Sequence, residues 1–194
     1  MTFAGVASRA PHARKHGTTF AESWTSADGA TIVVVGAVLG GNDPVVVGDL
    51  LRTGARALVT SRKALGIALG ALDRVVQKHA REHRDDLLAA AVMLFAFAHD
   101  GSDVDAAGAG QLHAALIDGA GQHHPLHGRA AALGTGIEPR DVIETVHLRR
   151  DDIVVAATIP IEGRAWWDSG NRSAESLLHH SAAQDASATV ISAA

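Results

Sequence analysis

The sequence has no cysteine and no tyrosine, and its aromatic residues are limited to three tryptophans and four phenylalanines. The absence of cysteine excludes disulfide frameworks, Cys-ligated zinc sites, iron–sulfur clusters and thiolate nucleophiles. It is also typical of proteins in a reducing compartment, so we expect a cytoplasmic location. Because aromatic residues make up only 4% of the chain, Ala, Val, Leu and Ile must fill the core.

The chain also lacks an excess of positive charge and any hydrophobic run long enough to cross a membrane. It carries 17 Lys and Arg against 21 Asp and Glu, which gives a formal net charge of −4 and makes nucleic acid a poor candidate partner. The longest apolar runs, residues 31–39 and 87–98, fall short of the ~20 residues of a membrane helix. The N-terminus lacks the pattern of a signal peptide. We therefore expect a soluble intracellular protein that binds neither nucleic acid nor membranes.

What the sequence does contain is a succession of short apolar segments separated by glycine-rich and Asp-Gly turns, a pattern typical of antiparallel sheets. Residues 31–35 are β-branched and wholly apolar, which indicates a strand buried on both faces, and residues 36–44 should form a glycine-rich turn. A three-stranded β-meander is expected over residues 87–98, 104–110 and 112–117. Further strands are predicted at residues 2–8, 20–26, 142–148, 153–157 and 188–192.

Two consecutive helices are expected after the third strand. In residues 44–60 apolar side chains recur every three to four positions, and Asp43 with Pro44 supplies an N-cap and a first turn. Ser61 is predicted to cap the second helix, which should end before a charged connector at residues 81–86. A short amphipathic helix is predicted at residues 171–180.

These elements define the expected fold class. The strands are joined by short turns, so they should pair in an antiparallel manner, and the helices need an apolar sheet face to cover. We therefore predict an α+β fold in which two antiparallel sheets form a sandwich flanked by helices. A chain of 194 residues is long enough to bury a large core, and we assign residues 1–194 to a single domain.

Six short segments give the sequence a resemblance to a known family. They lie at residues 5–9, 22–24, 31–42, 108–111, 152–158 and 184–190. Their order resembles the metal-dependent protein phosphatase (PPM) family, an αββα sandwich. The type most similar is the small bacterial Ser/Thr phosphatase, such as the stressosome feedback phosphatase and the sporulation stage II E-type domains. The resemblance covers essentially the whole chain.

The resemblance implies a site where carboxylates at strand ends hold two Mn²⁺ or Mg²⁺ ions, which activate a water for attack on a phosphoserine. Several of these positions lack a carboxylate here. The first aspartate is replaced by Glu22, the second by Ala37 with Val38 beside it, the third by Ile159, and the last ligand position by Gln184. Only Glu22 and Asp185 remain as residual candidate metal ligands, and we therefore expect no bound cofactor, or Mn or Mg if the protein is active.

The resemblance thus implies a PPM-type phosphatase-like regulatory protein with impaired catalysis, a pseudophosphatase that acts by binding. Its partners would be those of a bacterial partner-switching stress-response pathway, a STAS-domain antagonist or its serine kinase. Trp166 and Trp167 are candidate partner-binding residues, because tryptophan is enriched at the centres of protein interfaces. An alternative is an active Mn- or Mg-dependent phosphoserine and phosphothreonine phosphatase with a non-standard metal site.

Two further motifs have plainer interpretations. His123, His124 and His127, with His113 upstream, contain the imidazoles that a transition-metal site needs, but the pattern is also that of a solvated hairpin tip, which we favour. Residues 36–42 follow a strand as a phosphate-binding loop does, but they lack the Gly-Lys-Ser/Thr ending of that motif.

Overall fold

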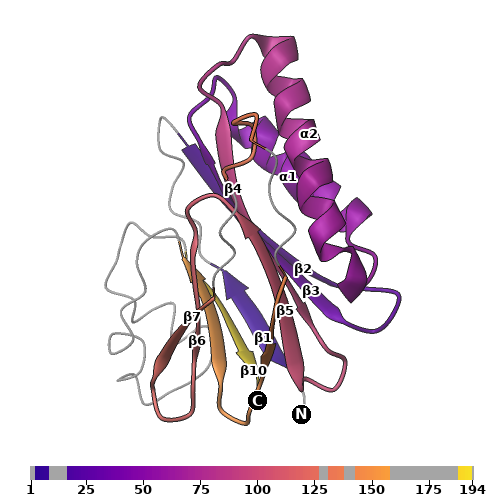
Figure 1. The fold of residues 1–194 in the computed structure, drawn as a ribbon, viewed down its shortest axis with the longest axis vertical. Helices are drawn as coiled ribbons and strands as arrows, with labels where there is room; N and C mark the ends of the chain where they lie inside the picture. Colours follow the sequence, from indigo (N-terminus) through magenta and orange to yellow (C-terminus); the bar gives the residue numbers. More distant parts are fainter. Residues whose placement is uncertain (1–2, 9–16, 127–130, 138–142, 158–187, 194) are drawn as a thin grey trace.

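The computed structural model describes residues 3–8, 17–126, 131–137, 143–157 and 188–193, and they form two five-stranded antiparallel sheets with a pair of helices (Figure 1). Sheet 1 contains, in spatial order, β1 (Phe3–Ser8), β10 (Ala188–Ala193), β9 (Ile153–Ala157), β6 (His113–Ile117) and β7 (His123–Leu126). Sheet 2 contains β2 (Gly17–Thr25), β3 (Thr31–Leu39), β4 (Ala89–Phe97), β5 (Asp103–Ala109) and β8 (Glu144–His147). The predicted α+β sandwich of two antiparallel sheets is confirmed.

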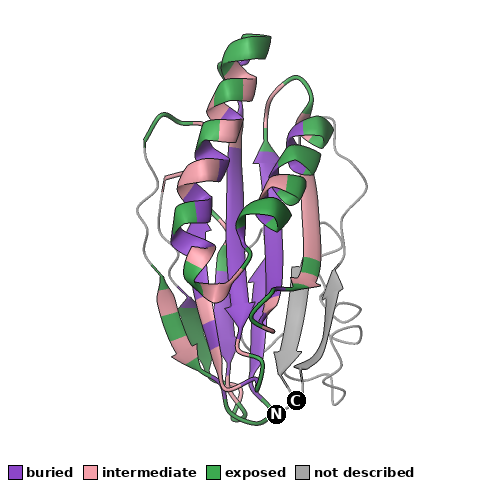
Figure 2. Cartoon of the chain, turned by 90° about the vertical axis from the view of Figure 1, so that its right-hand side faces the viewer, coloured by how far each residue is buried: buried purple, intermediate pink, exposed green. Residues whose placement is uncertain are grey.

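Two helices, α1 (Pro44–Leu58) and α2 (Leu65–His83), cover one face of sheet 2 and lie side by side (Figures 1 and 2). The predicted cap of α1 is confirmed, because the Asp43 carboxylate accepts a hydrogen bond from the Val46 amide at 3.3 Å and Pro44 opens the helix. The helix predicted at residues 171–180 lies outside the described residues. No described helix combines the length and the apolar character that crossing a membrane requires.

Sheet 2 separates two apolar cores, so both of its faces are buried. Along β3, Ile32 and Val34 pack into the core beneath the helices, whereas Val33 and Val35 pack into the core between the two sheets. The alternation follows from the two-residue period of a strand. Two-sided burial explains why β3 and β4 are nearly continuous apolar runs, and Figure 2 shows these strands as buried beneath helices with exposed outer faces.

β3 is longer than the sequence pattern predicts, since it continues through residues 36–39, which the glycine content assigns to a turn. Gly36 lies opposite Phe20 of β2, and a Cβ at this position would approach the Phe20 ring to 2.2 Å. The glycine is therefore needed inside the strand, where it leaves room for an aromatic ring. The turn itself is confined to residues 40–43.

The predicted β-meander is wrong in its third strand. β4 and β5 form a hairpin in sheet 2, but β6 pairs with β7 and β9 in sheet 1. The chain changes sheets at Gly110, which has a φ of +79° and lies so close to β4 that a Cβ would be 2.7 Å from Ala91 Cβ. Only glycine combines that backbone conformation with that close approach.

The start and end of α2 also differ from the prediction. Ser61 forms no side-chain capping bond, and residues Arg62–Ala64 make a 3-10 turn before α2 begins at Leu65. The Asp28 carboxylate, from the turn after β2, accepts from the Arg62 amide at 3.2 Å. Arg84, with φ of 51°, ends the helix in a left-handed conformation, so α2 extends into the segment predicted as a charged connector.

Replacing Gly110 with Ala should destabilise the protein by about 2–4 kcal/mol, because it adds a steric clash with Ala91 to the cost of a positive φ. Gly136→Ala is a matched control, since Gly136 has a φ of +77° but no atom lies within 4 Å of the place that a Cβ would occupy. The control should lose only about 1 kcal/mol. Denaturant unfolding of both variants measures the difference, and equal losses would contradict the close approach of Gly110 to β4.

Candidate functional site

Of the positions that the family resemblance assigns to metal binding, Ala37 and Val38 lie near the end of β3. In sheet 2 the end of β3 lies beside the start of β4, with Leu39 paired to Ala89. In sheet 1 the last residue of β9, Ala157, pairs with His113 at the start of β6. The connection between β5 and β6 is only residues 110–112, so it holds these strand ends near one another. We call this region the candidate edge.

The turn after β3 is fixed firmly at this edge. Gly40 and Gly41 have φ values of +81° and +89°, and a Cβ on Gly40 would lie 2.8 Å from the Leu87 carbonyl oxygen. The buried Asp85 carboxylate accepts from the Asn42 amide at 2.6 Å. The corner between α2 and β4 therefore holds the turn in place, and Asp85 is already engaged in that contact.

A row of small residues crosses sheet 2 at the candidate edge, on the face toward sheet 1. Ala37 pairs with Thr19 on β2 and with Ala91 on β4, and Gly110 lies against Ala91. The strand alternation places these residues on the same face as the core between the sheets. Val38 points the other way, into the core beneath the helices. We call Thr19, Ala37, Ala91 and Gly110 the small-residue row.

The small-residue row offers one side-chain oxygen and no carboxylate. Thr19 Oγ1 is buried and has no hydrogen-bond partner among the described residues. Two hard divalent cations need several oxygen ligands with negative charge. Within the described residues, no group of three or more His, Asp or Glu side chains could hold a metal ion. The described part of the candidate edge therefore does not fit a pair of Mn²⁺ or Mg²⁺ ions.

Glu22 lies on the other face of β2, together with Phe20 and Trp24, which pack against the core beneath the helices. Its carboxylate pairs with Arg56 at 2.5 Å and with Arg52 at 3.7 Å, both on α1. The structure thus does not bring Glu22 and Ala37 together. Sequence reasoning missed Thr19, which the strand register places beside Ala37. The alternation of polar and apolar residues along β2 is the signal that could have identified it.

The other residues singled out from the sequence divide into two groups. Ile159, Gln184, Asp185, Trp166 and Trp167 lie outside the described residues. His113 begins β6, and His123 and His124 lie in β7 instead of at a hairpin tip, so that prediction is wrong for these three. His127 lies outside the described residues. His123 pairs with Ile117, at the far end of β6 from His113, and His124 Nε2 lies 3.1 Å from Asp118 Oδ2.

The carboxylates with shifted pKa values lie away from the candidate edge. The Ser26 hydroxyl lowers the pKa of Asp28, and the His124 ring lowers the pKa of Asp118. The Ser102 amide lowers the pKa of Asp100. All three carboxylates lie in turns at the opposite ends of β3, β6 and β4 from the candidate edge. These carboxylates accept hydrogen bonds that stabilise turns. The lowered pKa values therefore have a structural cause and do not indicate a catalytic role.

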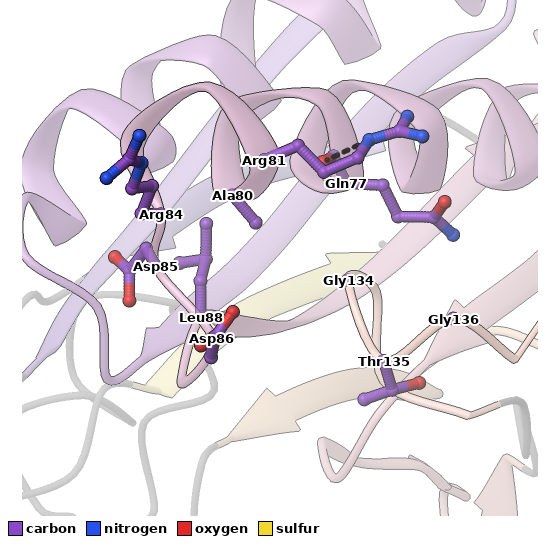
Figure 3. Close-up of a pocket in the computed structure, with 10 residues that line it drawn as sticks. All are labelled: Gln77, Ala80, Arg81, Arg84, Asp85, Asp86, Leu88, Gly134, Thr135 and Gly136. Atoms are coloured by element: carbon purple, nitrogen blue, oxygen red, sulfur yellow. Dashed lines mark hydrogen bonds between the residues drawn. The ribbon is translucent and has the colours of Figure 1, made fainter.

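A polar groove of about 620 Å³ opens beside the start of β4, between the last turns of α2 and the loop at residues 134–136 (Figure 3). Arg81 is turned along α2, where its Nε donates to the Gln77 carbonyl oxygen at 3.2 Å. The loop is tied to the helix through Asp73, which accepts from the Gly134 amide at 2.8 Å. The groove lies on the helix side of sheet 2, so it does not share a face with the small-residue row.

Comparisons with known proteins agree with this architecture. Residues 27–191 match the family model for stage II sporulation protein E (SpoIIE). No curated protein matches the sequence. Among solved structures, the chain is similar to a serine/threonine phosphatase of S. agalactiae, with a TM-score of 0.73, 9% identity and 96% of each chain covered.

Two further solved structures share this fold. The catalytic domain of the serine/threonine phosphatase PstP in complex with two manganese ions has a TM-score of 0.67 and 12% identity, and the similarity covers 96% of this chain and 95% of that one. A structure described in work on the bacterial stressosome has a TM-score of 0.66 and 11% identity, with 96% of each chain covered. At these identities the likeness concerns the fold alone.

Replacing Glu22 with Gln should lower the free energy of unfolding only slightly. It should leave the affinity for Mn²⁺ unchanged, because the carboxylate faces α1. A double-mutant cycle of Glu22→Gln with Arg56→Gln should give a coupling free energy of up to about 1 kcal/mol that weakens with added salt. The exposed pair of Asp49 and Arg52 serves as the comparison. A change in Mn²⁺ binding in Glu22→Gln would contradict this placement.

Proposed function

The chain belongs to the SpoIIE family of PPM-type phosphatases, and we propose that it is a regulatory member with impaired hydrolysis that acts by binding signalling proteins. The single observation that carries the proposal is Ala37. Its methyl group occupies the β3 position at which the resemblance expects a metal-binding aspartate. β3 contains no acidic residue, and the register of β2, β3 and β4 is continuous through this position, so a shift of one residue would not bring a carboxylate here.

The surrounding scaffold supports the same proposal. The turn after β3 keeps its two left-handed glycines and its contact with Asp85, although position 37 of β3 carries a methyl group in place of a carboxylate. A fold maintained in this way presents a defined surface even without hydrolysis. Without a metal pair, the water that attacks phosphorus in this family would have no activating charge. The residues of this chain would then bind a phosphorylated protein and shield it.

We further propose that the partners are proteins of a bacterial partner-switching stress response, a STAS-domain antagonist or its serine kinase. Support comes from the family membership and from the similarity to a structure described in work on the stressosome. Trp166 and Trp167 are the proposed contact residues, because large aromatic side chains dominate protein interfaces. This assignment rests on residue type and on position in the sequence.

Mn²⁺ titrated into the protein should show no site tighter than about millimolar, since the described edge has too few oxygen ligands. Release of phosphate from a phosphoserine STAS-domain protein, measured in excess Mn²⁺, should not exceed the rate without enzyme. Uptake of two ions at micromolar concentration together with turnover would overturn the proposal and favour an active phosphatase with a non-standard metal site.

Ala37→Asp provides the matched gain-of-charge test. The new carboxylate would lie on the face toward sheet 1 beside Thr19, so it should tighten Mn²⁺ binding by about tenfold or more. Ala37→Asn has nearly the same size without the charge and should not tighten binding. Circular dichroism of both variants tests whether the fold survives the substitution at this buried position. Equal binding by the two variants would contradict the role assigned to position 37.

Partner binding can be tested with the intact chain and a purified STAS-domain protein in phosphorylated and unphosphorylated form. We expect binding without loss of the phosphate, and we expect Trp167→Ala to weaken it by about 2 kcal/mol, or roughly thirtyfold. Trp24→Phe is a control, since Trp24 packs against the core beneath the helices. Binding that is unaffected by substitution of both Trp166 and Trp167 would contradict their role.

A further inference from the structure

His79 and His83 form an isolated pair of imidazoles near the end of α2. They are four residues apart, which places them one above the other on the same helix face. Their rings are stacked, with centroids 4.2 Å apart and an angle of 29° between the ring planes. His83 is exposed at the helix end and His79 is half-buried, so solvent reaches both.

Within the described part of the chain, no side chain or backbone group occupies the ring nitrogens of this pair. Among the described residues, neither imidazole has a hydrogen-bond or ion-pair partner, and the only contact recorded is the stacking between the two rings. Other histidines differ, since His99, His124 and His147 each place a ring nitrogen against a backbone or carboxylate oxygen. On the same stretch of helix, Lys78 and Glu82 form an ion pair at 3.8 Å, and Arg81 and Arg84 add positive charge at the helix end.

We propose that His79 and His83 form a two-imidazole binding site for a transition-metal ion of the Zn²⁺, Ni²⁺ and Cu²⁺ class. Two histidines at positions i and i+4 of a helix can ligate one zinc ion, and neutral imidazole nitrogens suit these metals. In tetrahedral geometry with Zn–N bonds of about 2.0–2.1 Å, the two nitrogens lie about 3.3 Å apart. Because solvent reaches both side chains, rotation about their side-chain torsions can bring one nitrogen of each ring to that spacing.

This site is chemically distinct from the candidate edge. Mn²⁺ and Mg²⁺ prefer carboxylate and water oxygens, whereas the pair offers only nitrogen. Water would fill the remaining coordination positions, because no third His, Asp or Glu joins the pair within the described residues. A bound ion would link the last two turns of α2, immediately before the corner where Asp85 holds the turn after β3.

Calorimetric titration of the full chain with ZnCl₂ or NiCl₂ tests the proposal. We expect one site to be lost, or weakened by about tenfold or more, in both His79→Ala and His83→Ala. The chain has twelve histidines, so His99→Ala and His123→Ala are needed as controls and should retain the site. Alanine is the best helix former, so the test variants should keep α2 intact.

A second pair of measurements makes the test specific to geometry. The double variant His83→Ala with Arg81→His keeps the number of histidines but moves the second ring to another side of the helix, so the site should be lost. In NMR spectra, Cu²⁺ should broaden the signals of His79 and His83 first. Unchanged binding in the double variant, or broadening elsewhere only, would overturn the proposal. The pair shares no residue with the candidate edge, so this outcome and that of the phosphatase test are independent.

Discussion

The burial of sheet 2 on both faces is the constraint on which the rest of the structure depends. Because helices cover one face and sheet 1 covers the other, each residue of β2, β3 and β4 belongs to one layer or the other by its position in the two-residue period. Ala37 therefore faces sheet 1, whereas Glu22 faces α1 and pairs with its arginines. A slip of one residue would exchange the two cores, so packing fixes the chemistry available at each face.

Local contacts then hold the candidate edge in one shape. Gly40 and Gly41 adopt left-handed conformations close to the corner between α2 and β4, and Asp85 fixes the Asn42 amide. Gly110 brings the crossing between the sheets against β4. Each glycine is required by both its conformation and the space around it. Packing and hydrogen bonds of the chain itself thus define the shape of the edge.

Much of this fold follows from sequence patterns, because apolar runs and Asp-Gly turns are local signals. The bounds of α1 and the hairpin of β4 with β5 are of this kind. The errors come from long-range contacts: Gly36 stays in β3 because Phe20 of another strand needs the space, and β6 leaves for sheet 1 at Gly110. The position of Ala37 in the candidate site can be predicted from the sequence. Its neighbour on β2, Thr19, can be identified only once the pairing register of β2 and β3 is known.

The charges around the edge limit how a phosphorylated partner can be recognised. Two divalent ions about 4 Å apart repel by on the order of 17 kcal/mol at an effective dielectric constant of about 20, so several carboxylates must offset them. A methyl group and one hydroxyl in the small-residue row cannot do so. Without cations, a phosphate dianion needs arginines or lysines, yet Arg52 and Arg56 are held by Glu22 on the helix side. The small-residue row itself contains no cationic side chain, so a phosphorylated partner placed against it would be held there by shape and apolar contacts more than by its phosphate charge.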